Sequence, residues 1–208
     1  MELRPEKFKL IAGDLSLDLV NTASQWQRTD KAYAPTGESI GDIADLISWA
    51  LKANAIDEKA ARVLAAKTAN GGTQSLRRAR KLRAAIYGLA VAIVDGKQPT
   101  ADDLEYLNKE RLRALERQTF DYASGKFELK RRPGVEPLDA IIDTIALAAV
   151  ELLSSDRSKR IRRCGGESCG WLFVDDSRGR NRHWCDMRDC GNLAKVRRFR
   201  KKAAKVAS

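Results

Sequence analysis

Four cysteines, the only ones among 208 residues, fall into two pairs with the same spacing. Cys164 and Cys169 are separated by four residues. Cys185 and Cys190 repeat that spacing, and fifteen residues lie between the pairs. Two short-spaced pairs can bring four thiolates into the tetrahedral shell of a zinc site. Because four cysteine ligands leave no open coordination position, we expect one structural zinc ion and not a catalytic one.

A disulfide framework is the rival interpretation of these cysteines. Disulfides are typical of oxidising compartments and of small domains without a sufficient core. This chain is 43% hydrophobic, and its first residues lack the apolar segment of a secretory signal. The most apolar stretch, residues 140–153, is too short to cross a bilayer and contains Asp143 and Glu151. We therefore expect reduced cysteines, a cytoplasmic protein and no membrane partner.

The net charge of +11 is concentrated in one part of the chain. Residues 157–208 hold 16 Lys and Arg against 5 Asp and Glu, whereas residues 1–156 hold 23 of each. This asymmetry divides the chain into a neutral part, residues 1–156, and a basic zinc-binding part, residues 157–208. A strongly basic segment predicts a polyanionic partner, and nucleic acid is the default candidate.

The neutral part has mainly helical patterns, with apolar residues recurring at three and four positions and with capping residues such as Asp57 and Thr100. The expected helices cover residues 17–22, 39–51, 57–69, 73–94, 100–115 and 138–153. A small β-hairpin is expected around Gly125, and residues 26–37 predict a polar loop. The basic run from Arg77 to Arg83 predicts a solvated helix face.

A polar cluster interrupts the first expected helix. Asp18, Asn21 and Thr22 fall at i, i+3 and i+4, so they share one helix face within an apolar stretch. Two interpretations stay open. These residues line a ligand pocket together with Arg83 and Asn108, or they form a structural network in which buried polar groups satisfy one another and the backbone. Under either interpretation the residues should be buried.

The zinc-binding part predicts a β-hairpin followed by a helix. Strand-like residues 160–163 and 171–174 flank the first cysteine pair, which should therefore lie at the tip of a hairpin. After the second pair, residues 192–205 can form a helix, with Val196 and Phe199 facing a small core. A hairpin and a helix that begins near the second pair are the outline of a treble-clef zinc finger.

Basic residues cover most of this last helix and form a second cluster in the loop before Cys185. Such a helix can enter a major groove or lie along phosphates. The candidate nucleic-acid-binding residues are Arg178, Arg180, Arg182, Asn192 (also the expected helix cap), Lys195, Arg197, Arg198, Arg200, Lys201 and Lys202. Basic residues specify phosphate contact and not base choice, so selective binding and general polyanion binding both stay open. His183, the only histidine, is expected at the surface because four cysteines already satisfy zinc.

Several of these motifs together resemble a known pair of domains. Cys-x4-Cys, Phe173 and Asp175, followed by Trp184-Cys-x4-Cys-Gly-Asn192, resemble the CGNR zinc finger. The body motifs resemble the ABATE domain, which in bacteria usually precedes that finger; they are Leu17-Asp-Leu-Val-Asn-Thr22, Trp49, Leu82-Arg83 and Leu107-Asn108. One departure is Leu193, which stands where the arginine of the CGNR name would be, so any contact of that arginine falls to Lys195 or Arg197.

The resemblance implies a bacterial, stress-linked transcription regulator. Its helical domain, residues 1–156, would sense a small molecule, and its finger, residues 157–208, would bind DNA. An RNA- or protein-binding zinc module is the alternative. An enzyme is not expected, because the first 156 residues contain no cysteine, no histidine and no Gly-rich phosphate loop. Regulators of palindromic sites are often two-fold dimers, so a homodimer stays open, although no coiled-coil seam is visible.

Overall fold

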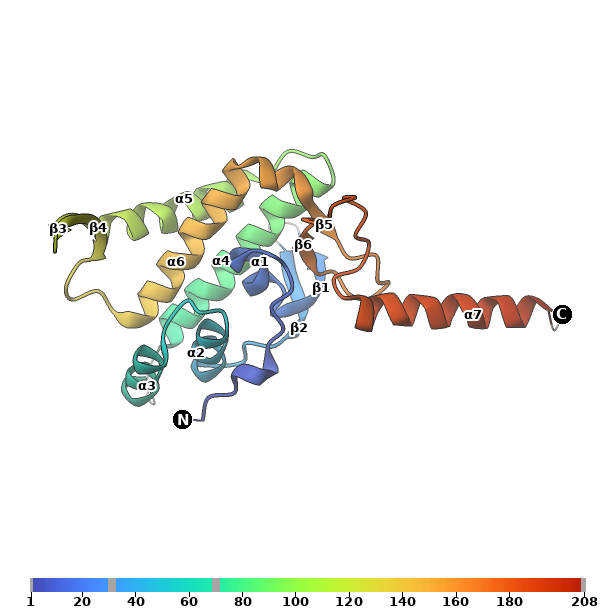
Figure 1. Cartoon of the computed structure of the whole chain (residues 1–208), viewed down its shortest axis with the longest axis horizontal. Helices are drawn as coiled ribbons and strands as arrows, with labels where there is room; N and C mark the ends of the chain where they lie inside the picture. Colours follow the sequence, from blue (N-terminus) through green and yellow to red (C-terminus); the bar gives the residue numbers. More distant parts are fainter. Residues whose placement is uncertain (1, 30–32, 69–71, 207–208) are drawn as a thin grey trace.

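The computed structural model describes residues 2–29, 33–68 and 72–206, the last six as backbone only. These residues form a mainly α structure with three separate two-stranded antiparallel sheets (Figure 1). The elements are α1 (Leu15–Val20), β1 (Ala23–Arg28), β2 (Tyr33–Glu38), α2 (Ile43–Lys52), α3 (Glu58–Lys67), α4 (Thr73–Val94), α5 (Ala101–Glu116), β3 (Gln118–Ala123), β4 (Lys126–Arg131), α6 (Pro137–Ser154), β5 (Ile161–Arg163), β6 (Leu172–Val174) and α7 (Asn192–Val206). Within the described residues, no helix combines the length and apolar character needed to cross a membrane.

The centre of the molecule is a bundle in which α4, α5 and α6 pack against one another (Figure 1). The apolar composition of α6 explains its central place, because Ile141, Ile142 and Ile145 are fully buried. The short helix α1 packs against both α4 and α6. The helical bundle expected from the sequence is therefore confirmed, and α1 contacts two of its three central helices.

Side-chain caps fix where the helices begin. Asp14 Oδ1 accepts a hydrogen bond from the amide of Ser16 at the start of α1, at 3.0 Å. At the start of α5, Thr100 Oγ1 accepts a bond from the Asp103 amide at 3.2 Å, as the sequence pattern predicted. These bonds satisfy amides that have no partner within the first turn of the helix.

The prediction of a polar loop at residues 26–37 is wrong. This stretch contributes to a hairpin of β1 and β2, in which Trp26 pairs with Pro35. The hairpin is held by aromatic packing, since the rings of Trp26 and Tyr87 stack with centroids 4.3 Å apart, and Tyr33 meets the same tyrosine edge-on. Packing against α4 therefore stabilises strands whose polar composition alone predicted a loop.

The solvated face expected for the basic run of α4 is also only partly correct. Arg78 makes ion pairs with Glu110 at 2.6 Å and with Asp139 at 2.5 Å, which tie α4 to α5 and α6. Arg80 donates to the carbonyl oxygens of Ile40 and Gly41. These guanidinium groups hold the bundle together, because each reaches a partner distant in sequence.

The zinc-binding segment shares the hydrophobic core of the bundle. Ile161, Leu172 and Val174 of β5 and β6 belong to the same buried cluster as the central helices. The amide of Val174 donates to the carbonyl oxygen of Ala12 at 2.8 Å, so the edge of β6 is bonded to the segment before α1. The neutral and basic parts of the sequence are therefore packed together and not joined by a free linker.

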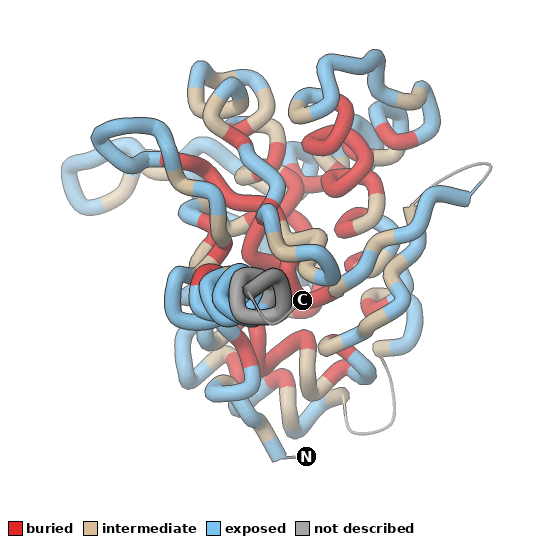
Figure 2. Tube along the Cα trace, turned by 90° about the vertical axis from the view of Figure 1, so that its right-hand side faces the viewer, coloured by how far each residue is buried: buried red, intermediate tan, exposed pale blue. Residues whose placement is uncertain are grey.

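Helix α7 projects away from this core (Figure 1). Figure 2 shows α7 nearly end-on, and its residues up to Arg200 are exposed except for Ala194, which is partly buried. The expectation that Val196 and Phe199 would face a small core is wrong, since Phe199 is 74% exposed and Val196 is 47% exposed. The finger's own small core is built instead from the cysteines, Phe173 and the two tryptophans around them.

Candidate metal centre and basic helix

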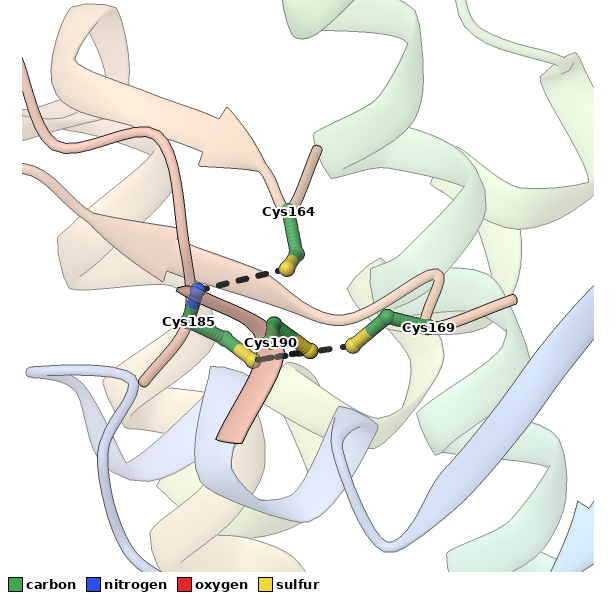
Figure 3. Close-up of side chains that lie close together, drawn as sticks. All are labelled: Cys164, Cys169, Cys185 and Cys190. Carbon is green, nitrogen blue, oxygen red and sulfur yellow. Dashed lines mark hydrogen bonds between the residues drawn. The ribbon is translucent and has the colours of Figure 1, made fainter. Parts of the chain in front are cut away.

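The side chains of the four cysteines converge on one point (Figure 3). Their sulfur atoms all lie within 4.8 Å of one another, with Cys169 Sγ 3.5 Å and Cys190 Sγ 3.6 Å from Cys185 Sγ. A tetrahedral zinc site with Zn–S bonds of about 2.3 Å requires sulfur separations of about 3.8 Å. A disulfide requires about 2.05 Å, and all four thiols are free. The residues therefore fit one structural Zn²⁺, and the disulfide alternative does not hold.

Crowding spreads the pKa values of these thiols apart. Hydrogen bonds from the thiols of Cys169 and Cys185 lower the pKa of Cys164 to about 2. Their bonds to Cys164 raise the pKa of Cys169 to about 12 and also raise that of Cys185. One thiolate therefore forms readily, whereas full ionisation of the group needs a cation to offset the accumulating negative charge. A divalent ion supplies that offset.

Backbone geometry around the cysteines explains two of the motif's glycines. A Cβ atom on Gly166 would lie 3.1 Å from Cys190 Sγ, which leaves little room beside the metal ligands. A Cβ atom on Gly191 would lie 2.8 Å from the sulfur of Met187 and 3.2 Å from the Trp184 ring. A side chain at position 191 would therefore require the end of Met187 to move and would crowd the Trp184 ring.

Each cysteine pair occupies a defined place in the local fold. Cys164 directly follows β5, and Cys169 lies three residues before β6, so the first pair is at the tip of the β5–β6 hairpin as predicted. The second pair precedes α7. The expected capping role of Asn192 is wrong, because this residue already has helical geometry and donates backwards to Arg188 O at 3.0 Å. Asp186 instead caps the preceding turn, accepting from the Arg188 amide at 2.8 Å.

Phe173 and Asp175 stabilise the finger and are not surface contacts. Phe173 is fully buried, and the Arg182 guanidinium lies 4.2 Å from its ring centroid. The carboxylate of Asp175 accepts bonds from the Ser177 amide at 3.1 Å and the Arg182 amide at 3.0 Å, which closes the loop between them. The Arg182 side chain also donates to the carbonyl oxygens of Ile11 and Trp184, each at 3.0 Å. The Arg182 guanidinium is thus held by contacts within the fold, and its role in nucleic-acid binding stays a prediction.

The other basic candidates whose side chains the structure describes are at the surface. Arg178 and Arg180 are exposed in the loop before the second pair, and Lys195, Arg198 and Arg200 are exposed on α7. Arg197 is about half exposed and makes an ion pair of 2.9 Å with Glu167, at the tip of the first cysteine loop. Lys201 and Lys202 continue the helix backbone, but their side chains lie outside the described residues. His183 is exposed, as expected.

The polar cluster on α1 is a structural network. Asp18 Oδ1 accepts hydrogen bonds from the amides of Ile11 and Ala12, both at 2.9 Å. Burial is the main reason that the pKa of Asp18 is raised to about 6, against the lowering effect of those two amides. The carboxylate therefore fixes the segment whose Ala12 carbonyl binds β6.

Asn21 and Thr22 make the same kind of structural contact. The Asn21 side chain donates to Leu172 O at 2.8 Å and accepts from Leu172 N at 2.9 Å. Thr22 Oγ1 accepts from Arg83 at 2.9 Å, and this arginine, 1% exposed, also pairs with Glu38. These hydrogen bonds are the ones that the network interpretation predicts, and the residues are buried as expected. Ligand binding by the same residues stays a prediction.

Asn108 does not belong to this cluster. It lies on α5 and is exposed, contrary to the expectation of burial. Its neighbour Leu107 is buried in the core instead. The helical period explains the error, because adjacent residues of one helix point in different directions and only one of the two can face the bundle.

Sequence reasoning missed several residues that anchor the finger to the bundle. Arg157 donates to Gly13 O at 2.6 Å, and Arg163 pairs with Asp95 at the end of α4 at 3.0 Å. The Trp171 indole donates to Ala23 O at 3.1 Å. No local pattern could have identified these partners, since each pair is separated by more than 60 residues.

Comparison with protein families agrees with this architecture. The ABATE family, described as "putative stress-induced transcription regulator", matches residues 13–156. The CGNR zinc finger matches residues 160–203, which include all four cysteines. No curated protein matches the chain. Because the first match covers more than half of the sequence, the chain belongs to the ABATE family, and a CGNR zinc finger follows its ABATE domain.

Proposed function

We propose that this regulator binds duplex DNA through α7 and the loop that contains Arg178 and Arg180. The single observation that supports this most is the isolation of α7, which leaves the bundle at its first turn and exposes basic side chains to solvent (Figure 1). The excess charge of the chain lies in this part, since residues 157–208 hold 16 basic and 5 acidic residues. A helix of this kind matches the charge and the width of a major groove.

The dimensions of α7 support the same proposal. Its 15 residues span about 22 Å, which is enough to contact several base pairs along a groove. Lys195 and Arg198 are exposed at i and i+3, so they share one face of the helix. The zinc ion would fix the start of α7, because Cys190 lies two residues before it. Zinc thereby orients the proposed reading element without taking part in contacts to DNA.

For the small-molecule effector we propose a binding place away from the polar residues of α1. A cavity of about 550 Å³ lies beside the zinc ligands, between Trp171, Trp184 and the first turns of α7. Leu193 and Arg197 also line it. A ligand there would contact the base of α7 directly, which supplies a route by which binding could change the helix orientation. Effector binding would then be measured as a change in DNA affinity.

Selection from a pool of random duplex DNA at physiological salt tests the DNA proposal. We expect one enriched motif for the zinc-loaded protein and loss of affinity of at least about tenfold for the Lys195→Gln, Arg198→Gln double variant. Arg62→Gln is the matched control, because Arg62 is a highly exposed cation on α3, remote from the finger. Equal losses for both variants, or no binding at all, would reject α7 as the DNA contact.

RNA binding is the second candidate, and one observation favours it. Phe199 is 74% exposed on α7 between basic residues, and an exposed aromatic ring can stack on an unpaired base. Binding to duplex DNA does not use this ring in the same way, because a duplex offers no unpaired base on which it could stack. Competition between single-stranded RNA and duplex DNA separates the candidates, because Phe199→Leu should weaken RNA binding far more than DNA binding if stacking contributes.

A further inference from the structure

The β3–β4 hairpin carries an apolar face that no described residue covers. Phe120 lies opposite Leu129, and Tyr122 lies opposite Phe127, so the four side chains share one face of the hairpin. They are 72%, 68%, 61% and 68% exposed, respectively. The rings of Phe120 and Phe127 are stacked with centroids 5.3 Å apart, and Tyr122 lies 4.9 Å from Phe127. We call these four residues the hairpin patch.

The opposite face of the hairpin is polar and already paired. Lys130 makes ion pairs with Asp121 at 3.0 Å and with Glu128 at 2.9 Å. These contacts leave no comparable apolar surface on that side. The hairpin therefore has the two-faced pattern of a sheet that packs against something on one face only.

The hairpin also lacks the support that such a unit needs. It is a separate two-stranded sheet that extends beyond the end of α5, far from α7 (Figure 1). An isolated two-stranded hairpin is at best marginally stable in water and normally needs a further layer on its apolar face. Because the hairpin needs this cover to be stable, its partner should always be present. A second copy of the chain meets that requirement.

The exposed area is sufficient for self-association. With about 200 Å² for each aromatic side chain and somewhat less for leucine, the fractional exposures correspond to about 500 Å² in the hairpin patch. Two such patches that cover each other completely would bury about 1,000 Å², which is at the lower limit for a specific interface. Leu112 and Leu115, both exposed in the last turns of α5, add apolar surface where the helix leads into the hairpin.

Charge also favours a second copy at this place. The patch belongs to residues 1–156, which hold 23 basic and 23 acidic residues, whereas the excess of +11 lies at the other end of the molecule. Two copies that meet through their hairpins thus keep the strongly basic segments 157–208 apart, and residues 118–132 bring only a small excess of 4 basic over 2 acidic residues to the contact. Contact through α7 would bring those segments together.

We infer that the hairpin patch packs against the same patch of a second copy, forming a two-fold homodimer with both α7 helices uncovered. A two-fold interface uses the same surface on both partners, as a single exposed apolar face permits. The inference goes beyond the proposed nucleic-acid binding and does not depend on it. The dimer should form in the absence of any nucleic acid.

Molar mass in solution tests the inference directly. Sedimentation equilibrium of the zinc-loaded full chain at micromolar concentration should give twice the chain mass of 23.1 kDa. The Phe120→Ser, Phe127→Ser double variant should raise the dimer dissociation constant by more than about tenfold, because it removes stacked aromatic residues from the centre of the interface. Phe199→Ser is the matched control, since this phenylalanine is equally exposed but lies on α7, and it should leave the dimer intact.

A photo-crosslinking amino acid at position 122 keeps the test decisive if the double variant misfolds. We expect a crosslinked dimer in which the label joins two hairpins, and no such product with the label at position 199. A monomeric wild type at about 100 μM, crosslinks that map away from the hairpin, or a double variant that dimerises as well as the wild type would each overturn the inference. A monomer that binds a different protein through the patch would also overturn it.

Discussion

Asn21 and Leu172, 151 residues apart, are joined by two hydrogen bonds in which one side-chain amide pairs with both backbone groups of one residue. The Asn21 amide occupies the outer edge of β6 as a neighbouring strand would. The most distinctive stretch of the ABATE domain, residues 17–22, is therefore a docking element for the zinc finger. Residues that suggested a ligand pocket in the sequence thus also connect the helical domain to the finger.

Asn21→Ala should destabilise the protein by about 2–4 kcal/mol, because it leaves the buried amide and carbonyl groups of Leu172 unpaired. Urea unfolding followed by circular dichroism measures this loss. Asn108→Ala provides the control, since Asn108 is exposed and should change stability by less than about 0.5 kcal/mol. Equal effects of the two substitutions would contradict the docking role.

Removal of zinc should destabilise the bundle as well as the finger. The reason is that Ile161, Leu172 and Val174 are part of the central hydrophobic core, so disordering of the finger exposes that core to water. Differential scanning calorimetry should show one cooperative transition that shifts to lower temperature in the presence of a strong chelator. A bundle transition unchanged by the chelator would show that the two parts fold independently.

Asp18 should make stability depend on pH between about 4 and 7. Its folded-state pKa of about 6 exceeds the ordinary value of 3.8, so the folded protein holds this proton more tightly than the unfolded chain. The resulting stabilisation is complete at low pH and is lost as the pH rises through about 6, by at most about 3 kcal/mol.

The Asp18→Asn variant separates this effect from those of other carboxylates. The free energy of unfolding of the wild type, relative to the variant, should fall between pH 4 and 7 and stay constant above that range. Denaturant unfolding at several pH values measures the difference. Parallel curves for the two proteins would show that Asp18 does not titrate in this range.

Substitution of Arg180 should affect DNA binding, whereas substitution of Arg182 should affect thermal stability. Arg182→Ala removes side-chain bonds to backbone carbonyl oxygens and the stacking on Phe173, so it should lower the melting temperature by several degrees. Arg180→Ala should leave the melting temperature unchanged and reduce the salt dependence of DNA binding by about one unit of log–log slope. Thermal unfolding and DNA binding at several salt concentrations, measured for both variants, test this prediction. The opposite result would assign the structural role to Arg180 and the DNA contact to Arg182.

Local patterns in the sequence determined a large part of this molecule. The spacing of Cys164, Cys169, Cys185 and Cys190 predicted the metal centre, because short-spaced pairs restrict where the sulfur atoms can point. The boundaries of α4 and the cap at Thr100 were likewise predictable, since helical period and capping depend on residues within a few positions.

Only the tertiary structure decided what the polar residues of α1 do. Asp18, Asn21 and Thr22 satisfy equally well the pattern of a pocket and that of a network, and the choice depends on partners such as Leu172 and Arg83, which are distant in sequence. The β1–β2 hairpin and the structural role of Arg182 were missed for the same reason. Burial and hydrogen bonding act through space, so a residue whose partner is distant in sequence acquires its role only when the chain folds.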